Sequence, residues 1–268
     1  MSKSILRKKL LLPLIFAIAG LTYLGTTVLS SGSKKDGIVR VNNSTHSCEL
    51  LSAEKHNGYL SVRVQNNSNK GMTALVLTSR IDSRTVFTFK EEFAFSEANL
   101  VIAPGNYYDK MISIPGSLNR QNEITLSLSA VFFEDNSSEG DQEIVRDVED
   151  NRLGEKLQLM KALPILDKIA GLSDNDIGRY WSKTARHEFQ AALDAQDTEL
   201  LIQSNDKVSK GRNLAESEQF KLGAQAGKEY VVQKYQELRD KQSQQGTPAL
   251  REEIMGLRDL YSKMITRL

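Results

Sequence analysis

The chain has 268 residues, of which 40% are apolar and 26% charged, so its composition is that of a folded globular protein and excludes a wholly disordered one. Its 35 basic and 34 acidic side chains nearly cancel. Because nucleic-acid binders usually carry a basic excess, we expect no nucleic-acid partner. The single cysteine, Cys48, excludes an intramolecular disulfide and a cysteine-rich zinc site.

An uncharged apolar run near the N-terminus predicts attachment to a membrane. Residues 10–29 read "LLLPLIFAIAGLTYLGTTVL". At about 1.5 Å per residue, a helix of this length covers the roughly 30 Å hydrocarbon core of a bilayer. We therefore interpret residues 1–30 as the signal anchor and transmembrane helix of a single-pass membrane protein.

The charges around this run predict its orientation. Basic residues before the run outnumber Lys34 and Lys35 after it, which places the N-terminus in the cytoplasm and the rest of the chain outside; they are Lys3, Arg7, Lys8 and Lys9. The alternative is a secretory signal cleaved near "SSGS" at 30–33, after which the protein would be secreted. Both interpretations make the remaining chain extracytoplasmic.

Residues 37–138, which follow a short polar linker at 31–36, show the two-residue period of β-strands. In "YLSVRVQ", Leu60, Val62 and Val64 fall on one face, and "EITLSLSAVF" repeats the alternation. Turn signals rich in Gly, Pro and Asn separate about seven such runs. This spacing predicts an antiparallel β-sandwich of immunoglobulin-like architecture. The chain has no Cys–Trp–Cys pattern, which excludes a true antibody-type domain.

Residues 139–268 show the period of α-helices instead. Apolar residues recur at three- and four-residue steps in three stripes, which are Ile177, Trp181, Ala185, Phe189 and Ala192; Phe220, Ala224, Gly227, Val231 and Leu238; and Leu250, Ile254, Leu257, Tyr261, Met264 and Leu268. Lys234 and Tyr235 interrupt the second stripe. We predict four or five helices, with Ser173 capping one of them and Thr247 capping the last. The expected fold class is α+β, with several domains.

The acidic stretch "VFFEDNSSEGDQEIVRDVEDNR" at 131–152 invites a metal-binding interpretation, with Asp135, Glu139 and Asp141 as the candidate ligands. An EF-hand register that starts at Asp135 puts Arg146 at position twelve, where calcium needs a bidentate carboxylate. We therefore favour a joint, in which a strand ends at Phe133 and a helix begins near Asp141. A looser calcium site is the alternative. We expect no metal and no cofactor.

The same joint resembles a known group of proteins. The strand "AVFFEDNSSEGD" and the following helix "IVRDVEDNRLGEKLQLMKALPIL" are similar to the corresponding junction in uncharacterised bacterial membrane-anchored proteins, which pair a hydrophobic N-terminal segment with a small β-sandwich and helices. The resemblance covers only this junction and implies no activity. No catalytic residue is carried over from it.

Other chemistry-bearing residues form no recognisable catalytic set. His46 and Cys48 share a predicted strand face with His56 nearby, but a zinc site would lack its fourth ligand. A buried thiol flanked by surface histidines is the more typical arrangement. The chain contains no Gly-x-Ser-x-Gly, His-Glu-x-x-His, Walker or Gly-x-Gly-x-x-Gly motif.

Candidate interaction residues lie in two places. Tyr107 and Tyr108, beside a Pro–Gly turn, could contact a ligand or could cover the end of the sandwich. In the last helix, the stripe of Leu257, Tyr261 and Met264 must pack either against the chain's own helices or against another protein or copy. A further pattern, Gly-x-x-x-Gly at 223–227, predicts close packing of its helix against another element.

These observations favour a membrane-anchored, extracytoplasmic binding or assembly module that is not a catalyst. The alternative is an extracytoplasmic hydrolase whose site forms only on folding, because missing motifs weaken that hypothesis without removing it.

Overall fold

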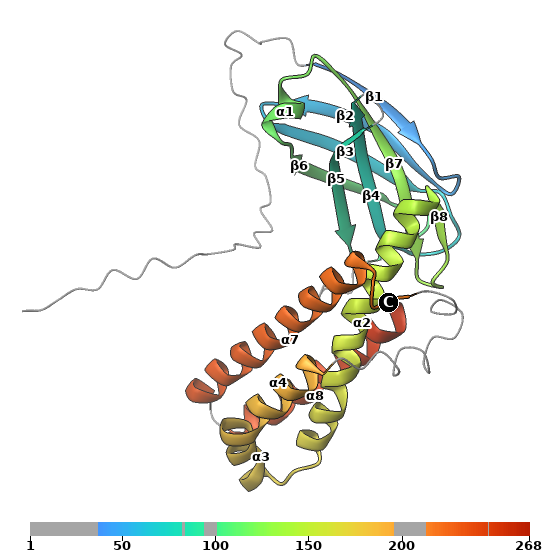
Figure 1. The fold of residues 1–268 in the computed structure, drawn as a ribbon. Coiled ribbons are helices and arrows are strands. Elements are labelled where there is room, and N and C mark those ends of the chain that lie inside the picture. The colour runs from blue at the N-terminus through green and yellow to red at the C-terminus, as the bar shows by residue number, and fades with distance from the viewer. Residues whose placement is uncertain (1–36, 82–83, 94–100, 196–212, 246) are drawn as a thin grey trace, which may run out of the picture. The chain divides into compact units, whose positions relative to one another are not determined.

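The computed structural model describes residues 37–81, 84–93, 101–195, 213–245 and 247–268 (Figure 1). Residues Asp36–Leu268 form one compact unit. Within the described part of the chain, no helix is both long and apolar enough to cross a membrane. The predicted anchor at residues 10–29 lies outside the described residues.

The first half of this unit is built from strands in two sheets. One sheet has the order β1-β7-β4-β5, with β8 also paired to β7, and the other has the order β2-β3-β6. A short helix, α1 (Gly116–Asn119), precedes β7. The strands are β1 (Ile38–Asn43), β2 (Cys48–His56), β3 (Tyr59–Asn66), β4 (Met72–Ile81), β5 (Arg84–Glu92), β6 (Tyr107–Ser113), β7 (Glu123–Phe133) and β8 (Ser138–Gly140).

The larger sheet is mixed, which corrects the prediction of a purely antiparallel sandwich. β1 runs parallel to β7, with Ile38 opposite Glu123 and Asn43 opposite Leu128. An alternating pattern records which face a side chain occupies, but it does not record the direction of the neighbouring strand. A parallel pair needs a long connection, and the whole of β2–β6 supplies it here.

The two sheets enclose a common core. The predicted inward residues of β3 are confirmed, because Leu60, Val62 and Val64 are all buried. They meet side chains from β4 and β7 of the other sheet, including Met72, Leu75, Leu77, Leu126, Leu128 and Phe133. The alternation seen in the sequence therefore does face a shared interior.

The acidic stretch is a joint, as predicted, with an additional strand inside it. β7 ends at Phe133, β8 pairs back onto β7, and α2 (Gln142–Ala170) follows at once. The Asp141 carboxylate accepts hydrogen bonds from the backbone N–H groups of Glu143 and Ile144 at 3.0 and 3.4 Å. Asp141 is therefore the N-cap of α2, and the helix begins where the sequence predicted.

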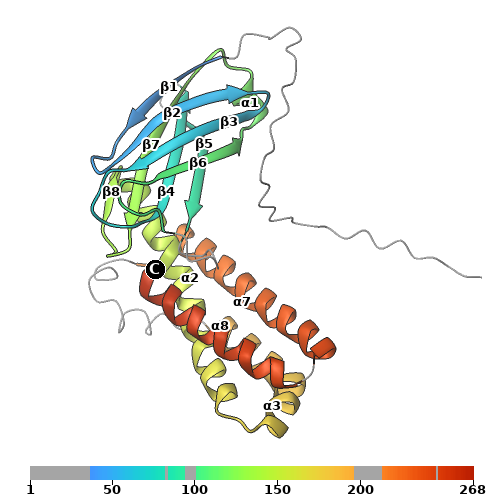
Figure 2. The same ribbon diagram turned by 180° about the vertical axis from the view of Figure 1, so that it is seen from behind.

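The second half consists of packed helices (Figure 2). Ser173 caps α3 as predicted, because its side chain accepts a hydrogen bond from the backbone N–H of Asp176. A π-helical turn joins α3 to α4 without a break. The elements are α3 (Asp174–Tyr180), η1 (Trp181–Ala185), α4 (Arg186–Asp194), α7 (Glu218–Gln245) and α8 (Thr247–Arg267).

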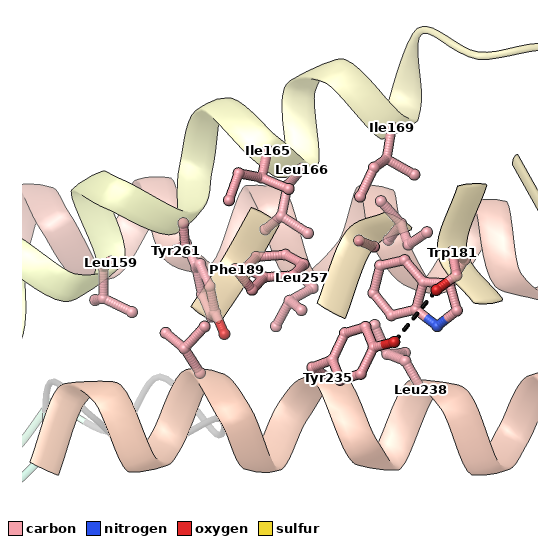
Figure 3. Packing of buried hydrophobic residues seen from close by; sticks show 14 of the residues in the cluster. Leu159, Ile165, Leu166, Ile169, Trp181, Phe189, Tyr235, Leu238, Leu257 and Tyr261 are labelled. Atoms are coloured by element: carbon pink, nitrogen blue, oxygen red, sulfur yellow. Dashed lines mark hydrogen bonds between the residues drawn. The ribbon is translucent and has the colours of Figure 1, made fainter. Parts of the chain in front are cut away.

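Side chains from all three apolar stripes meet in one helical core (Figure 3). Phe220, at the start of the second stripe, instead belongs to a smaller cluster with Leu153, Leu157 and Leu214. Tyr235, which interrupts the stripe in the sequence, belongs to the helical core. Its ring lies 4.8 Å from that of Trp181, and its hydroxyl donates to the Trp181 carbonyl at 3.2 Å. A tyrosine can be buried in this way when its polar end finds an acceptor.

The last stripe packs against the chain's own helices, which is one of its two predicted outcomes. Leu257, Tyr261 and Met264 are 9%, 0% and 1% exposed. In this fold these side chains are therefore not a surface for a partner. Their partners in the core come from α2, η1 and α7, and include Leu166, Trp181 and Val231.

The glycines at 223–227 allow α7 to touch α2, as predicted. A Cβ on Gly223 would overlap the backbone of Asn151, and one on Gly154 would overlap the Phe220 carbonyl oxygen. The two helices therefore meet backbone to backbone, which only glycine permits at these positions.

Candidate ligand-binding cleft

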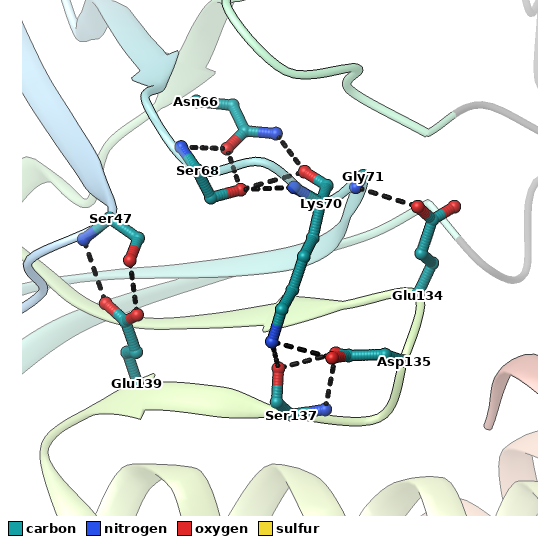
Figure 4. Close-up of polar contacts among 9 residues, drawn as sticks. All are labelled: Ser47, Asn66, Ser68, Lys70, Gly71, Glu134, Asp135, Ser137 and Glu139. Atoms are coloured by element: carbon teal, nitrogen blue, oxygen red, sulfur yellow. Dashed lines mark hydrogen bonds and ion pairs between the residues drawn. The ribbon is translucent and has the colours of Figure 1, made fainter.

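The three predicted metal-ligand candidates do not converge. Asp135 forms an ion pair with Lys70 at 2.6 Å, whereas Glu139 accepts hydrogen bonds from Ser47 (Figure 4). Glu139 also accepts one from the backbone N–H of His46. The third candidate, Asp141, caps α2. Across the described residues, no group of three or more His, Cys, Asp or Glu side chains is placed to hold a metal ion.

The partners of these carboxylates fix their charge. Hydrogen bonds from Lys70 and Ser137 lower the pKa of Asp135 to about 2. Partial burial opposes ionisation of Glu139, but hydrogen bonds from Ser47 outweigh it and lower the pKa of the carboxyl group. Both groups therefore tie turns of the β-region together as carboxylates (Figure 4).

The cysteine candidate is a buried thiol. Cys48 lies 2% exposed, with its Sγ 3.5 Å from Asn66 Oδ1 and 3.8 Å from Met72 Sδ. Burial, with the nearby negative charge of Glu139, raises its pKa to about 12. The thiol is thus packed as a small apolar side chain, and His46 and His56 are exposed.

The two tyrosines beside the Pro–Gly turn have different roles. Tyr108 is buried in the β-core, and its hydroxyl donates to Glu91 at 2.8 Å. Tyr107 is 53% exposed, and the Arg63 guanidinium lies over its ring at 5.5 Å. Of the pair, Tyr107 alone is at the surface.

A cleft of about 530 Å³ lies between the outer face of β4–β5 and one flank of α2. Its volume is within the range of small-molecule sites. The strands contribute Val76, Thr78, Arg80, Thr85, Thr88 and Lys90; α2 contributes Glu143, Ile144, Asp147, Val148 and Asn151; Gln219 of α7 completes the lining.

Local structure explains why these residues share one cleft. The β4–β5 register places Val76 opposite Lys90, Thr78 opposite Thr88 and Arg80 opposite Thr85. Strand residues two apart point to the same face, which puts Val76, Thr78 and Arg80 on one side of β4, and Thr88 and Lys90 on one side of β5. A register shift between Ser79 and Arg80 brings Thr85 opposite Arg80, and Thr85 also lines the cleft. The α2 residues are spaced by one, three and four positions, which puts them on one helical face.

The wall formed by α2 is held at both ends. Near its start, Arg80 contacts Asp141 at 3.3 Å. Near the far end, Lys90 donates to Asn151 Oδ1 at 2.5 Å. The Arg80–Asp141 contact lies at one end of the cleft and the Lys90–Asn151 contact at the other. Lys90 is opposite Val76, so residue numbers rise along α2 in the direction in which they fall along β4. The helix therefore runs antiparallel to β4. Both cations that line the cleft already have protein partners.

The acidic side chains of the cleft are different. Within the described residues, neither Glu143 nor Asp147 forms a side-chain ion pair. Burial raises the pKa of Asp147, and the charges of Glu143 and Asp150 raise it further, while Arg146 opposes the change. The cleft therefore contains two mutually repelling carboxyl groups, one helical turn apart.

A buried ion pair, immediately after Asn151, anchors the N-terminal half of α2 to the sheet. Arg152 donates to both carboxylate oxygens of Glu92, at 2.7 and 3.0 Å, and to Thr73 at 3.2 Å. Its guanidinium lies 4.5 Å from the centre of the Phe132 ring. One turn further, Glu155 is 8% exposed, and its Oε2 has no hydrogen-bond partner in the described part of the chain.

The environment of Glu155 disfavours its charge. Burial, followed by the charge of Glu92, raises its pKa to about 7, against the attraction of Lys90 and Arg152. Glu155 does not line the cleft, but Lys90 does.

No pattern in the sequence predicts this cleft. Its strand residues are ordinary outward-facing positions, and Glu143 and Asp147 fall in the helix expected to follow the joint. The available signal was the shared helical face of Glu143, Asp147 and Asn151, which only tertiary packing places beside β5. No family model, curated protein or solved structure matches the chain. The chemistry of the cleft is therefore the basis for its interpretation.

Proposed function

We propose that the protein is a single-pass, membrane-anchored module that displays its β-sandwich and helices outside the cytoplasm and binds a small amphipathic ligand in the cleft, without catalysing a reaction. The apolar run at residues 10–29 and the charges around it support the anchor and its orientation. Two sheets around one core support an immunoglobulin-like architecture for the β-region.

The main support for ligand binding is the distribution of charge in the cleft. Arg80 and Lys90 are engaged with Asp141 and Asn151, so the charges left for a ligand are those of Glu143 and Asp147. A ligand with an ammonium group would relieve the repulsion between these two carboxylates.

The rest of the lining suits the body of such a ligand. Val76, Ile144 and Val148 give an apolar surface, and Thr78 and Thr88 supply hydroxyl groups near it. A mostly apolar surface with a few converging polar groups is typical of sites that bind small molecules.

The hydrolase alternative has one observation in its favour. Glu155 has a pKa near neutrality, as a general acid or base requires. The side chain is buried, however, and does not line the cleft. Turnover of chromogenic ester or glycoside probes that is lost in Glu155→Gln would favour the hydrolase.

Three probes that share one body test the binding proposal. Phenylpropylamine, phenylpropanol and phenylpropanoate are titrated into the protein by calorimetry. The amine is expected to bind best, because charge-assisted hydrogen bonds contribute about 1.5–3 kcal/mol. Glu143→Gln with Asp147→Asn should weaken the amine about tenfold or more. Glu252→Gln, which removes one exposed carboxylate on α8, is the control. Equal binding of all three probes, or no difference between the variants, would refute the proposal.

Topology is tested separately. A reporter that is active only outside the cytoplasm, fused after Leu268, is expected to be active. Activity of a cytoplasmic reporter at the same position would overturn the orientation inferred from the N-terminal charges.

A further inference from the structure

A second hollow lies in the helical region, between α4 and α7. Its volume is about 270 Å³, and its floor includes the rings of Phe189 and Tyr235. This volume is slightly below the usual range for a whole small-molecule ligand. It suits one chemical group of a ligand better than a complete molecule.

Two arginines line this hollow, one from each helix. Arg186 belongs to α4 and Arg239 to α7. No carboxylate among the described residues forms an ion pair with either of them. Asp240 lies at the same rim but has an interaction of its own. The hollow therefore presents two guanidinium groups that are available to an anion.

The charges of both arginines affect the same side chain, Tyr235. Burial raises the pKa of the Tyr235 hydroxyl, and the charges of Arg239 and Arg186 oppose that rise. Both guanidinium groups are thus within electrostatic reach of one side chain in the floor of the hollow.

The helix that carries Arg186 has an unusual turn immediately before it. Residues Trp181–Ala185 form the π-helical turn η1, and α4 begins at Arg186. Such turns are rare and occur frequently at functional sites. Tyr235 holds this turn against α7 through its hydrogen bond to the Trp181 carbonyl. Tyr235 therefore both lines the hollow and contacts the π-helical turn.

We propose that this hollow binds the phosphate group of an anionic ligand, with Arg186 and Arg239 donating hydrogen bonds to its oxygens and the rings of Phe189 and Tyr235 beneath it. Guanidinium groups match the geometry of phosphate oxygens and can bind them in pairs. The phosphate belongs either to the headgroup of an anionic phospholipid or to a soluble phosphate ester.

The chain contains a built-in reporter for this site. Trp181 is the single tryptophan of the sequence, and its ring lies 4.8 Å from Tyr235 and 6.2 Å from Phe189. Tryptophan fluorescence therefore reports on the floor of the hollow without any added label.

The test uses the full chain in micelles of a neutral detergent. Glycerol phosphate is the soluble probe, short-chain phosphatidylglycerol mixed into the micelles is the lipid probe, and glycerate at equal ionic strength is the carboxylate comparison. A saturable change in Trp181 fluorescence with glycerol phosphate supports the proposal and assigns a soluble ligand. A saturable change only with phosphatidylglycerol supports it and assigns a lipid headgroup.

Variants decide whether the hollow is responsible. Arg186→Gln with Arg239→Gln should weaken binding at least about tenfold, since hydrogen bonds to a charged group are lost. Arg179→Gln, on the exposed surface of α3, should leave it unchanged. No saturable change with either phosphate probe up to about 10 mM, equal binding by the double variant, or equal binding of glycerate would overturn the proposal.

Discussion

Replacing Glu155 with glutamine should make the stability of the protein less dependent on pH. Glu155 is buried between α2 and its neighbours, near Glu92, and its Oε2 atom lacks a partner among the described residues. Glutamine keeps the shape of the side chain and cannot ionise. The comparison therefore isolates the effect of the charge.

The expected difference in the free energy of unfolding follows from the pKa of Glu155. Folding raises it from 4.5 to about 7, and each pKa unit corresponds to about 1.4 kcal/mol, so ionisation of the folded protein costs about 3 kcal/mol. The folded pKa is higher than the unfolded one. The stability contributed by the protonated group is therefore fully present below pH 4.5 and is lost as the pH rises through about 7.

Urea unfolding of residues 36–268, which form one compact unit, measures the effect at a series of pH values. At pH 4.5, the starting point of the shift, Glu155→Gln and the wild type should be close in stability. At about pH 8 the variant should be more stable by up to about 3 kcal/mol. Glu252→Gln, an exposed substitution, should follow the wild-type profile. Parallel profiles for the wild type and Glu155→Gln would refute the reasoning.

The helical region yields predictions for four further substitutions, all measured by urea unfolding of the same fragment. Gly223→Ala should destabilise it by about 1–3 kcal/mol, because the methyl group would overlap the backbone of Asn151. Gly256→Ala, with open space around it, should stabilise it by up to about 1 kcal/mol; an equal effect of the two would argue against the helix contact. Leu257→Asp should cost several kcal/mol, because it buries a charge in the helical core; unchanged stability would show that the stripe is not buried. Tyr261→Phe should leave stability unchanged or raise it by about 1 kcal/mol, since its buried hydroxyl has no partner in the described residues; a large loss would reveal an unseen partner.

The elements of the fold could be predicted from local pattern. The alternation of Leu60, Val62 and Val64 and the helical stripe ending at Leu268 both record burial directly, because each period corresponds to one face of a strand or helix. The N-cap at Ser173 and the start of a helix near Asp141 could also be predicted, since a cap is a contact between near neighbours in sequence.

Features that depend on distant segments could not be predicted in this way. The parallel pairing of β1 with β7 depends on where a strand returns after about eighty residues of intervening chain, which no local period encodes. Tyr235 was misjudged because its burial requires the Trp181 carbonyl of another helix. The cleft depends on α2 packing over β4 and leaving the outer face of β5 open.

The pairing of β1 with β7 also determines how the protein would respond to mechanical load. Strand β1 begins immediately after Gly37, and the end of β7 leads through β8 into α2. Tension that enters at Gly37 and leaves through α2 pulls these parallel strands in opposite directions along their length. The hydrogen bonds along the six-residue strand β1 are then loaded together in shear instead of being opened one after another. The strand nearest the proposed membrane anchor is thus joined to the fold in the geometry that resists pulling most strongly.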